Sequence, residues 1–208
     1  MRNSILFPLL FFSVVFGQPS FTGHIITTSA DGARSAYAVD VDSDGDMDML
    51  SADYNDDKIV WYENNGSESF TARTITTSAD GVYGVYAVDV DSDGDMDVLS
   101  ASTGDDKIAW YENNGSQSFT AHTITTNANS AHSVYALDVD RDGDMDVLSA
   151  SFVDDAIRWY ENNPNDPNGW TEHNISLAAD GAESVYAVDL DGDGGSGIEF
   201  PPDYPEGN

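Results

Sequence analysis

A run of alternating aspartates is the part of this sequence whose residue types could do chemistry. Residues 40–48 read Asp-Val-Asp-Ser-Asp-Gly-Asp-Met-Asp, and the run recurs with small changes at residues 89–97 and 138–146. Five carboxylates so close together repel one another at neutral pH unless a cation lies among them. Calcium takes about six to eight oxygen ligands, and Gly45 lets the loop bend sharply enough to direct several of them at one point. Since a merely acidic solvated turn would not need to recur three times, the runs predict calcium-binding loops.

Each aspartate of a run has an expected role. In the first copy, Asp40, Asp42, Asp44 and Asp48 offer carboxylate oxygens, and Asp46 offers a backbone carbonyl. A fourth run begins at residue 189 but has glycine at its ninth position, so we expect it to bind calcium less well. The predicted metal-binding residues are Asp40, Asp42, Asp44, Asp46, Asp48, Asp89, Asp91, Asp93, Asp95, Asp97, Asp138, Asp140, Asp142, Asp144, Asp146, Asp189, Asp191 and Asp193.

Three other interpretations of these loops fit less well. An EF-hand needs glutamate at position 12 and a helix after it, whereas Ser51, Ser100 and Ser149 stand at that position and strand-like residues follow. Magnesium is a weaker candidate than calcium because it keeps its waters and rarely uses all-protein sites. The glycines at 192, 194 and 197 spell a dinucleotide fingerprint, but prolines follow at once and there is no βαβ unit to support it.

The elements that must position the loops come from an internal repeat. Units begin at Phe21, Phe70, Phe119 and Trp170, and apolar residues alternate within them as they do in strands. Asn65-Gly66 and Asn114-Gly115 are strong tight-turn signals between strands. Each unit therefore predicts about four short antiparallel strands, which is the size of one β-propeller blade; an open antiparallel solenoid is the alternative. We expect an all-β fold with three complete repeats and a partial fourth, so that the propeller could be incomplete.

Composition limits the location and the partners. The 7 Lys and Arg against 38 Asp and Glu give a formal charge of −31, which disfavours nucleic acid and anionic membranes as partners. The absence of cysteine excludes disulfides and zinc–thiolate sites. Residues 1–17 have a basic start and an apolar run too short to span a membrane, which predicts a secretory signal peptide. Residues 18–198 form the repeat region and residues 199–208 a proline-rich tail, and Asn65, Asn114 and Asn174 lie in glycosylation sequons.

The repeat resembles a known family. The pattern DxDxDGxxD between two strands, with a following strand such as Ile108-Ala109-Trp110-Tyr111-Glu112-Asn113, resembles the FG-GAP or VCBS-type repeats of integrin α-subunit propellers and many secreted proteins. The resemblance extends from Phe21 to about Asp193. It implies a β-propeller whose blades carry calcium in hairpin loops, with extracellular recognition or adhesion as the common role.

The expected function is that of a secreted, calcium-binding, non-catalytic recognition or adhesion module. An active site needs a few unlike groups, and the carboxylate clusters of this sequence repeat the same groups in each unit. The alternatives are a lectin-like carbohydrate-binding propeller and the propeller part of a larger secreted hydrolase. Expected partners are an extracellular protein, matrix or glycan ligand, or further copies of the chain that complete the propeller. We expect specificity to depend on the variable pairs Tyr54-Asn55, Thr103-Gly104 and Phe152-Val153.

Overall fold

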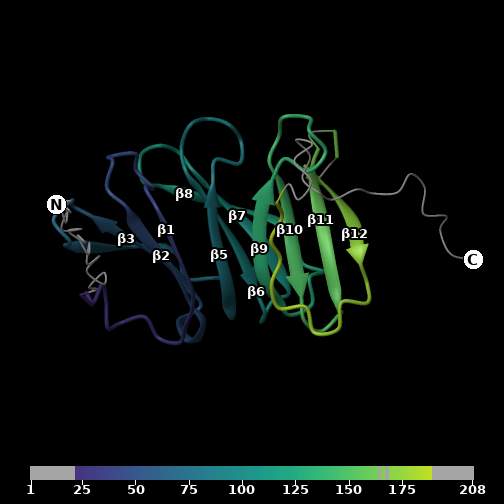
Figure 1. The fold of residues 1–208 in the computed structure, drawn as a ribbon, viewed down its shortest axis with the longest axis horizontal. Helices are drawn as coiled ribbons and strands as arrows, with labels where there is room; N and C mark the ends of the chain where they lie inside the picture. The colour runs from purple at the N-terminus through teal and green to yellow at the C-terminus, as the bar shows by residue number, and fades with distance from the viewer. Residues whose placement is uncertain (1–21, 164, 167–168, 189–208) are drawn as a thin grey trace, which may run out of the picture.

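The computed structural model describes residues 22–163, 165–166 and 169–188. The predicted signal peptide, the proline-rich tail and the fourth aspartate run with Asp189, Asp191 and Asp193 lie outside these residues. Within the described part, the chain consists of strands, turns and a single 3-10 turn, η1 (Tyr54–Asp56) (Figure 1). The predicted all-β class is confirmed.

The strands form three four-stranded antiparallel sheets in chain order. The first sheet contains β1 (Ala33–Val39), β2 (Asp48–Asp53), β3 (Lys58–Asn64) and β4 (Phe70–Thr76). The second contains β5 (Val82–Val88), β6 (Asp97–Ser102), β7 (Lys107–Asn113) and β8 (Phe119–Thr125). The third contains β9 (Ala131–Leu137), β10 (Asp146–Ser151), β11 (Ala156–Asn162) and β12 (Trp170–Ser176). These sheets are propeller-like blades, as predicted, and the described residues do not close them into a ring.

The sheets are out of phase with the sequence repeats. The unit that begins at Phe70 contributes its first strand, β4, to the outer edge of the first sheet, and only its later strands form the second sheet. The same shift recurs with β8 and β12. Each blade is therefore completed by the start of the next sequence unit, which links neighbouring blades through the chain.

Burial follows from the stacking of the blades. The second strand of each sheet is buried along almost its whole length because other sheets or segments cover both of its faces. Leu50 and Trp61 of the first sheet pack against Val85, Ala87 and Tyr111 of the second. The second and third sheets meet through an equivalent cluster, and residues 185 and 187 cover the next face of the third sheet. Trp61 is 1% exposed and packs between the first two sheets, and Trp159 is 6% exposed and packs in the cluster that contains Val185 and Ala187.

A row of tyrosines follows the first strands of the sheets. The ring centroids of Tyr37 and Tyr86 are 4.9 Å apart, those of Tyr86 and Tyr135 are 4.8 Å apart, and those of Tyr135 and Tyr186 are 4.9 Å apart. Burial, together with the neighbouring tyrosines, raises the pKa of Tyr86 above its usual range. The tilted contacts hold β1, β5 and β9 side by side, which is the arrangement of inner blade strands (Figure 1).

Candidate metal centre

The three described aspartate loops occupy the same place in each blade. Each connects the first strand of a sheet to the second, so the loops at 40–47, 89–96 and 138–145 all lie at one end of the blades. In Figure 1 this is the end toward which β9 points. The antiparallel register places Val39 opposite Asp48, so the first and last aspartates of a run come together at the base of its loop.

The loop closes through residues with positive φ. Gly45, Gly94 and Gly143 have φ values of 95°, 97° and 103°, which residues with a Cβ rarely adopt. A Cβ on Gly45 would meet no atom within 4 Å, so the backbone conformation, and not crowding, favours glycine there. The predicted bend is confirmed. Arg141, which replaces serine in the third loop, is exposed.

The fold brings three of the five aspartates of each loop together. One ligand oxygen from each of Asp40, Asp42 and Asp48 lies within 4.8 Å of the others, as do those of the equivalent triplets 89/91/97 and 138/140/146. Asp44 and Asp46 are outside the triplet: Asp44 Oδ1 accepts a hydrogen bond from the Asp46 N–H at 2.9 Å. The carboxylate of Asp46 lies against Gly66 in the turn between β3 and β4, where a Cβ would clash with it.

Backbone N–H groups fix two members of the triplet. Asp48 accepts hydrogen bonds from Val41 N–H at 3.1 Å and from Asn64 N–H at 2.7 Å, which ties the loop to the end of β3. Asp40 accepts from Asp44 N–H at 3.1 Å and from Gly45 N–H at 2.9 Å. Both side chains are therefore held in place without a cation, and both keep lone pairs for one.

Asp42 supplies the observation that points to a cation. Its Oδ1 is buried and accepts no hydrogen bond. Burial, with the charges of Asp44 and Asp48, raises the pKa of this carboxyl. A buried oxygen without a donor is costly, and a cation held by the three carboxylates would satisfy it. A donor set made only of carboxylate oxygens suits a hard ion such as calcium, so the residues fit the predicted metal.

The second aspartate of the triplet is more buried in the first loop than in the other two. Gln117, in the turn between β7 and β8 of the second blade, places its Nε2 3.5 Å from Asp42 Oδ2. Asp42 is partly buried, whereas its equivalents Asp91 and Asp140 are exposed. The first triplet therefore lies at a junction between two blades.

The third aspartate of the second and third triplets is a buried acid. Asp97 accepts from Val90 N–H at 3.0 Å and Asn113 N–H at 2.7 Å, and Asp146 makes the equivalent bonds to Val139 and Asn162. Burial raises the pKa of Asp97 to about 6, against the lowering effect of these N–H donors. Burial likewise raises the pKa of Asp146 to about 6.

Because of these two carboxyls, we expect the stability of the metal-free protein to depend on pH. Because their pKa in the folded chain lies above the model value of 3.8, the folded state binds the protons more tightly than the unfolded chain. The stability they contribute is present at about pH 4 and is lost as the pH rises through about 6. We expect the urea midpoint of calcium-stripped protein to be higher at about pH 4.5 than at about pH 7. A midpoint that rises over this range would contradict the assignment.

A pair of matched variants tests which aspartates form the site. Asp48→Asn removes a triplet carboxylate, whereas Asp44→Asn makes the same charge change at an exposed residue outside the triplet. We expect Asp48→Asn to lose about 2.7 kcal/mol of calcium-dependent stabilisation, the contribution of one site at about 100 times its dissociation constant, and Asp44→Asn to lose much less. Urea unfolding with and without calcium gives the difference directly. Equal losses would show that Asp44 is a ligand of equal importance.

Some residues of the site were not identified from the sequence. Asn64, Asn113 and Asn162 donate through their backbone N–H to the last aspartate and through their side chains to the loop carbonyls of residues 47, 96 and 145. The signal was present, because an asparagine ends the third strand of each sheet, but its partner lies 16 residues earlier in the chain.

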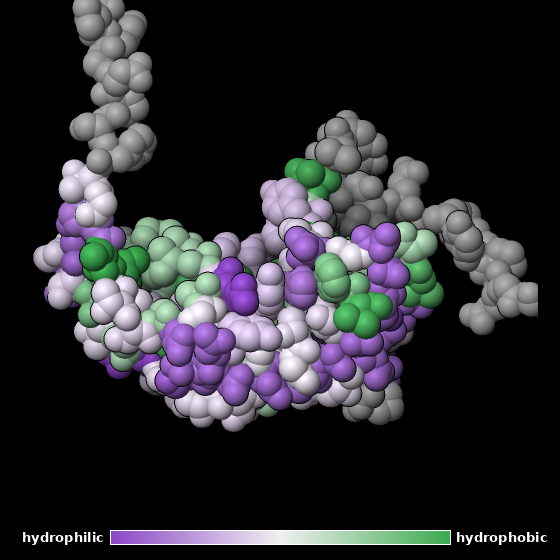
Figure 2. All heavy atoms as spheres, turned by 90° about the horizontal axis from the view of Figure 1, so that it is seen from below, coloured by the Kyte–Doolittle hydropathy of each residue, from purple (hydrophilic) through white to green (hydrophobic). Residues whose placement is uncertain are grey.

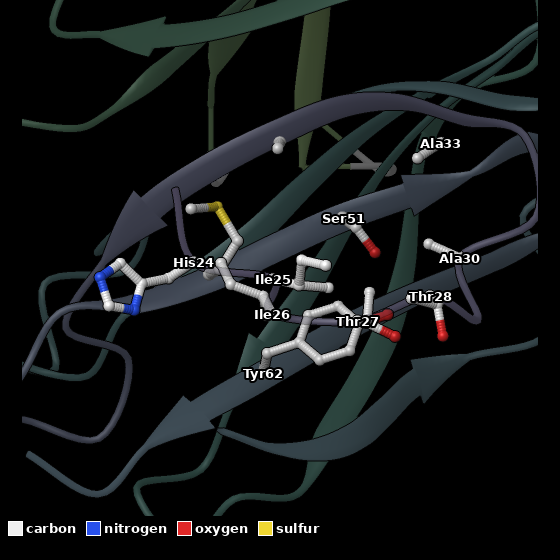
Figure 3. Close-up of a pocket in the computed structure, with 11 residues that line it drawn as sticks. His24, Ile25, Ile26, Thr27, Thr28, Ala30, Ala33, Ser51 and Tyr62 are labelled. Carbon is white, nitrogen blue, oxygen red and sulfur yellow. The ribbon is translucent and has the colours of Figure 1, made fainter. Parts of the chain in front are cut away.

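An open hollow of about 460 Å³ lies elsewhere, over the first sheet. Residues 24–30 form one side of it, and Ala33, Ser51 and Tyr62 are among the residues on the other side (Figure 3). In the second and third sheets the equivalent face is covered by the preceding blade. Its lining holds no carboxylate, so it is not a second candidate metal site. In the described residues, no helix is both long and apolar enough to cross a membrane.

A family model supports the repeat architecture. A family model described as FG-GAP-like repeat matches residues 40–100, 89–149 and 138–195, which together cover more than half of the chain. Among curated proteins, none matches the sequence. The structure of an Agrocybe aegerita lectin that recognises non-reducing terminal N-acetylglucosamine is similar with a TM-score of 0.49 and 17% sequence identity. The match covers 72% of this chain and 41% of that one, so the chain spans about two fifths of the lectin's length.

Proposed function

The chain belongs to the FG-GAP-like repeat family, and on that premise we propose that it is a secreted, calcium-stabilised, non-catalytic module for extracellular recognition or adhesion. The observation that carries the proposal is the set of three equivalent carboxylate triplets at one end of three stacked blades. Calcium is the ion that we assign to them. Export rests on the apolar segment within residues 1–17.

The proposed role of calcium is structural. In the first blade, the triplet joins the end of the first strand to the start of the second. Its last member, Asp48, also accepts a hydrogen bond from the backbone N–H of Asn64, at the end of the third strand. A bound ion would neutralise three carboxylates that otherwise repel one another and would hold these strand ends together. Since the same carboxylates recur in each blade, we assign them a common supporting role and no catalytic step.

Recognition would then depend on surface residues that the calcium-stabilised blades keep in fixed positions. Trp61 and Trp159 are buried and Trp110 is stacked on His122, so these tryptophans are not open platforms for sugar rings, and a protein or matrix partner is the first candidate. On the first sheet this face carries only residues 24–30 and an open hollow, whereas the equivalent faces of the other blades are buried against a neighbour; this difference gives self-association a physical basis.

Calcium titration of purified residues 18–208 by isothermal calorimetry tests the proposal. We expect binding with dissociation constants of about 10⁻⁴ to 10⁻³ M, at one ion for each intact triplet. The double variant Asp97→Asn, Asp146→Asn should retain one site. Heats that are unchanged by this variant would locate calcium elsewhere and overturn the proposal. The recognition role is tested by the binding of the same protein to immobilised extracellular matrix, with and without chelator.

A further inference from the structure

The repeats differ mainly at the end of the blades opposite the aspartate loops. Arg34, Tyr83, His132 and Glu183 occupy one repeat position, which lies at the start of the inner strand in the three sheets. Tyr54, Thr103 and Phe152 occupy another, directly after the second strand. The segment Tyr-Ala-Val/Leu-Asp shortly after the first position and the Asp-Asp pair shortly after the second recur in the three described blades, so the same scaffold accommodates these differences.

The fold brings the differing residues into one row across three blades. The Arg34 guanidinium lies 5.0 Å from the Tyr54 ring centroid and 5.4 Å from that of Tyr83. The Tyr83 ring stacks on His132 at 4.2 Å with 7° between the planes. His132 in turn stacks on Phe152 at 5.1 Å. We call Arg34, Tyr54, Tyr83, His132 and Phe152 the cross-blade row.

The row is partly exposed and apolar at the third blade. Phe152 is 40% exposed and the adjacent Val153 is 58% exposed. Burial lowers the pKa of His132, so its ring is neutral at pH 7. β10 points downward in Figure 1, so Figure 2 looks onto the end at which this strand finishes, where hydrophilic clusters and hydrophobic patches lie side by side.

Carboxylates surround the row. Asp31, Asp80, Asp180 and Glu183 are exposed at this end of the blades. Lys58 and Lys107, which begin β3 and β7, and Arg158, which lies within β11, each pair with an aspartate of the preceding loop. Arg34 is thus the one described cation at this end that is free to offset the four carboxylates. This end of the blades therefore has an excess of negative charge beside the aromatic side chains of the cross-blade row.

We propose that the cross-blade row binds a basic polypeptide segment that presents arginine or lysine side chains. The aliphatic stems of such side chains can lie along the ring edges of the row while their charged ends reach the surrounding carboxylates. Arg34 shows that this surface accommodates a guanidinium beside Tyr54 and Tyr83. The formal charge of −31 would also steer a cationic partner toward the protein.

The geometry favours this occupant over a saccharide. The faces of Tyr83 and His132 are stacked on neighbouring side chains, so they are not open platforms for a sugar ring. The inference deepens the proposed recognition role and rests on it, but it does not depend on the assignment of calcium.

Fluorescence anisotropy with a labelled hexa-arginine peptide tests the inference on residues 18–208 in calcium at physiological salt. The double change Phe152→Thr, Val153→Gly installs the pair that the second blade carries at the same position. We expect it to weaken peptide binding at least about fivefold without changing charge. Glu183→Gln should weaken binding about two- to fivefold. Glu68→Gln makes an equal charge change at the opposite end of the blades, beside the aspartate loops, and should have less than about a twofold effect.

Each outcome decides the inference. If Phe152→Thr, Val153→Gly binds like the parent and the two glutamine variants are equivalent, the peptide is held by general charge and the site is wrong. If the double variant instead abolishes binding on a glycan array and leaves the peptide unaffected, the occupant is a saccharide and the inference fails. Glu183 is exposed, so its variant remains informative if the double variant unfolds. An unchanged calcium-dependent melt in all variants separates this result from failure of the proposed function.

Discussion

Removal of calcium is expected to lower the thermal unfolding midpoint of residues 18–208 by about 15 to 30 °C. At about 10 mM calcium and a dissociation constant of about 10⁻⁴ M, each site stabilises the folded state by about 2.7 kcal/mol. The three described triplets together contribute about 8 kcal/mol, which is comparable to the whole stability of an ordinary domain. For a chain of this length, about 1 kcal/mol corresponds to about 2 to 4 °C.

Circular-dichroism melts in calcium and in chelator measure this shift. Magnesium at the same concentration is the matched control, because it carries the same charge but binds all-protein sites reluctantly. Coincident cooperative melts in calcium and chelator would show that the aspartate loops do not stabilise the fold through calcium. An equal shift with magnesium would mean that the ions act by screening the −31 charge.

Trp61→Ala is expected to destabilise the protein by about 3 to 5 kcal/mol, even in saturating calcium. Trp61 is 1% exposed and lies in the core between the first two blades, with Leu50 on its own sheet and Val85 on the next. Truncation would leave a cavity at the junction and remove the contacts that hold the blades together.

Urea unfolding of Trp61→Ala beside Ile25→Ala measures the effect against a control. Ile25 is 80% exposed, so its truncation should change the free energy of unfolding by less than about 0.5 kcal/mol. If the two variants were equally stable, the first two sheets would not share a core. A separate early transition in Trp61→Ala would indicate that the first blade unfolds before the others, as nearest-neighbour coupling in repeat proteins allows.

The sequence leaves undetermined where each blade begins and ends along the repeat. Alternating apolar residues predict the strands, and the asparagine–glycine pairs predict turns between them. The sequence unit that begins at Phe70 is equally compatible with a sheet that starts there. The structure instead gives β4 to the first sheet, because its hydrogen bonds to β3 decide where a blade ends.

The aspartate loops likewise have features that the sequence predicts and features that only the structure shows. The spacing of the carboxylates predicts Asp40, Asp42 and Asp48 as ligands, and the structure brings one oxygen of each within 4.8 Å of the others. The same pattern treats Asp44 as equivalent, since a linear motif does not show which side chains turn outward. The hydrogen bond from Asp46 N–H to Asp44 is a consequence of the three-dimensional turn.

The contacts of His132 could not be predicted from the sequence. It is an isolated histidine in the sequence, yet it lies between Tyr83 and Phe152, which come from two other segments of the chain. The sequence by itself determined the all-β class, the blade-sized repeat and the acidic loops, because these depend on local alternation, turn residues and the spacing of like charges. Only the tertiary structure decided the blade boundaries, the triplets and the cross-blade row, because these depend on contacts between residues far apart in the chain.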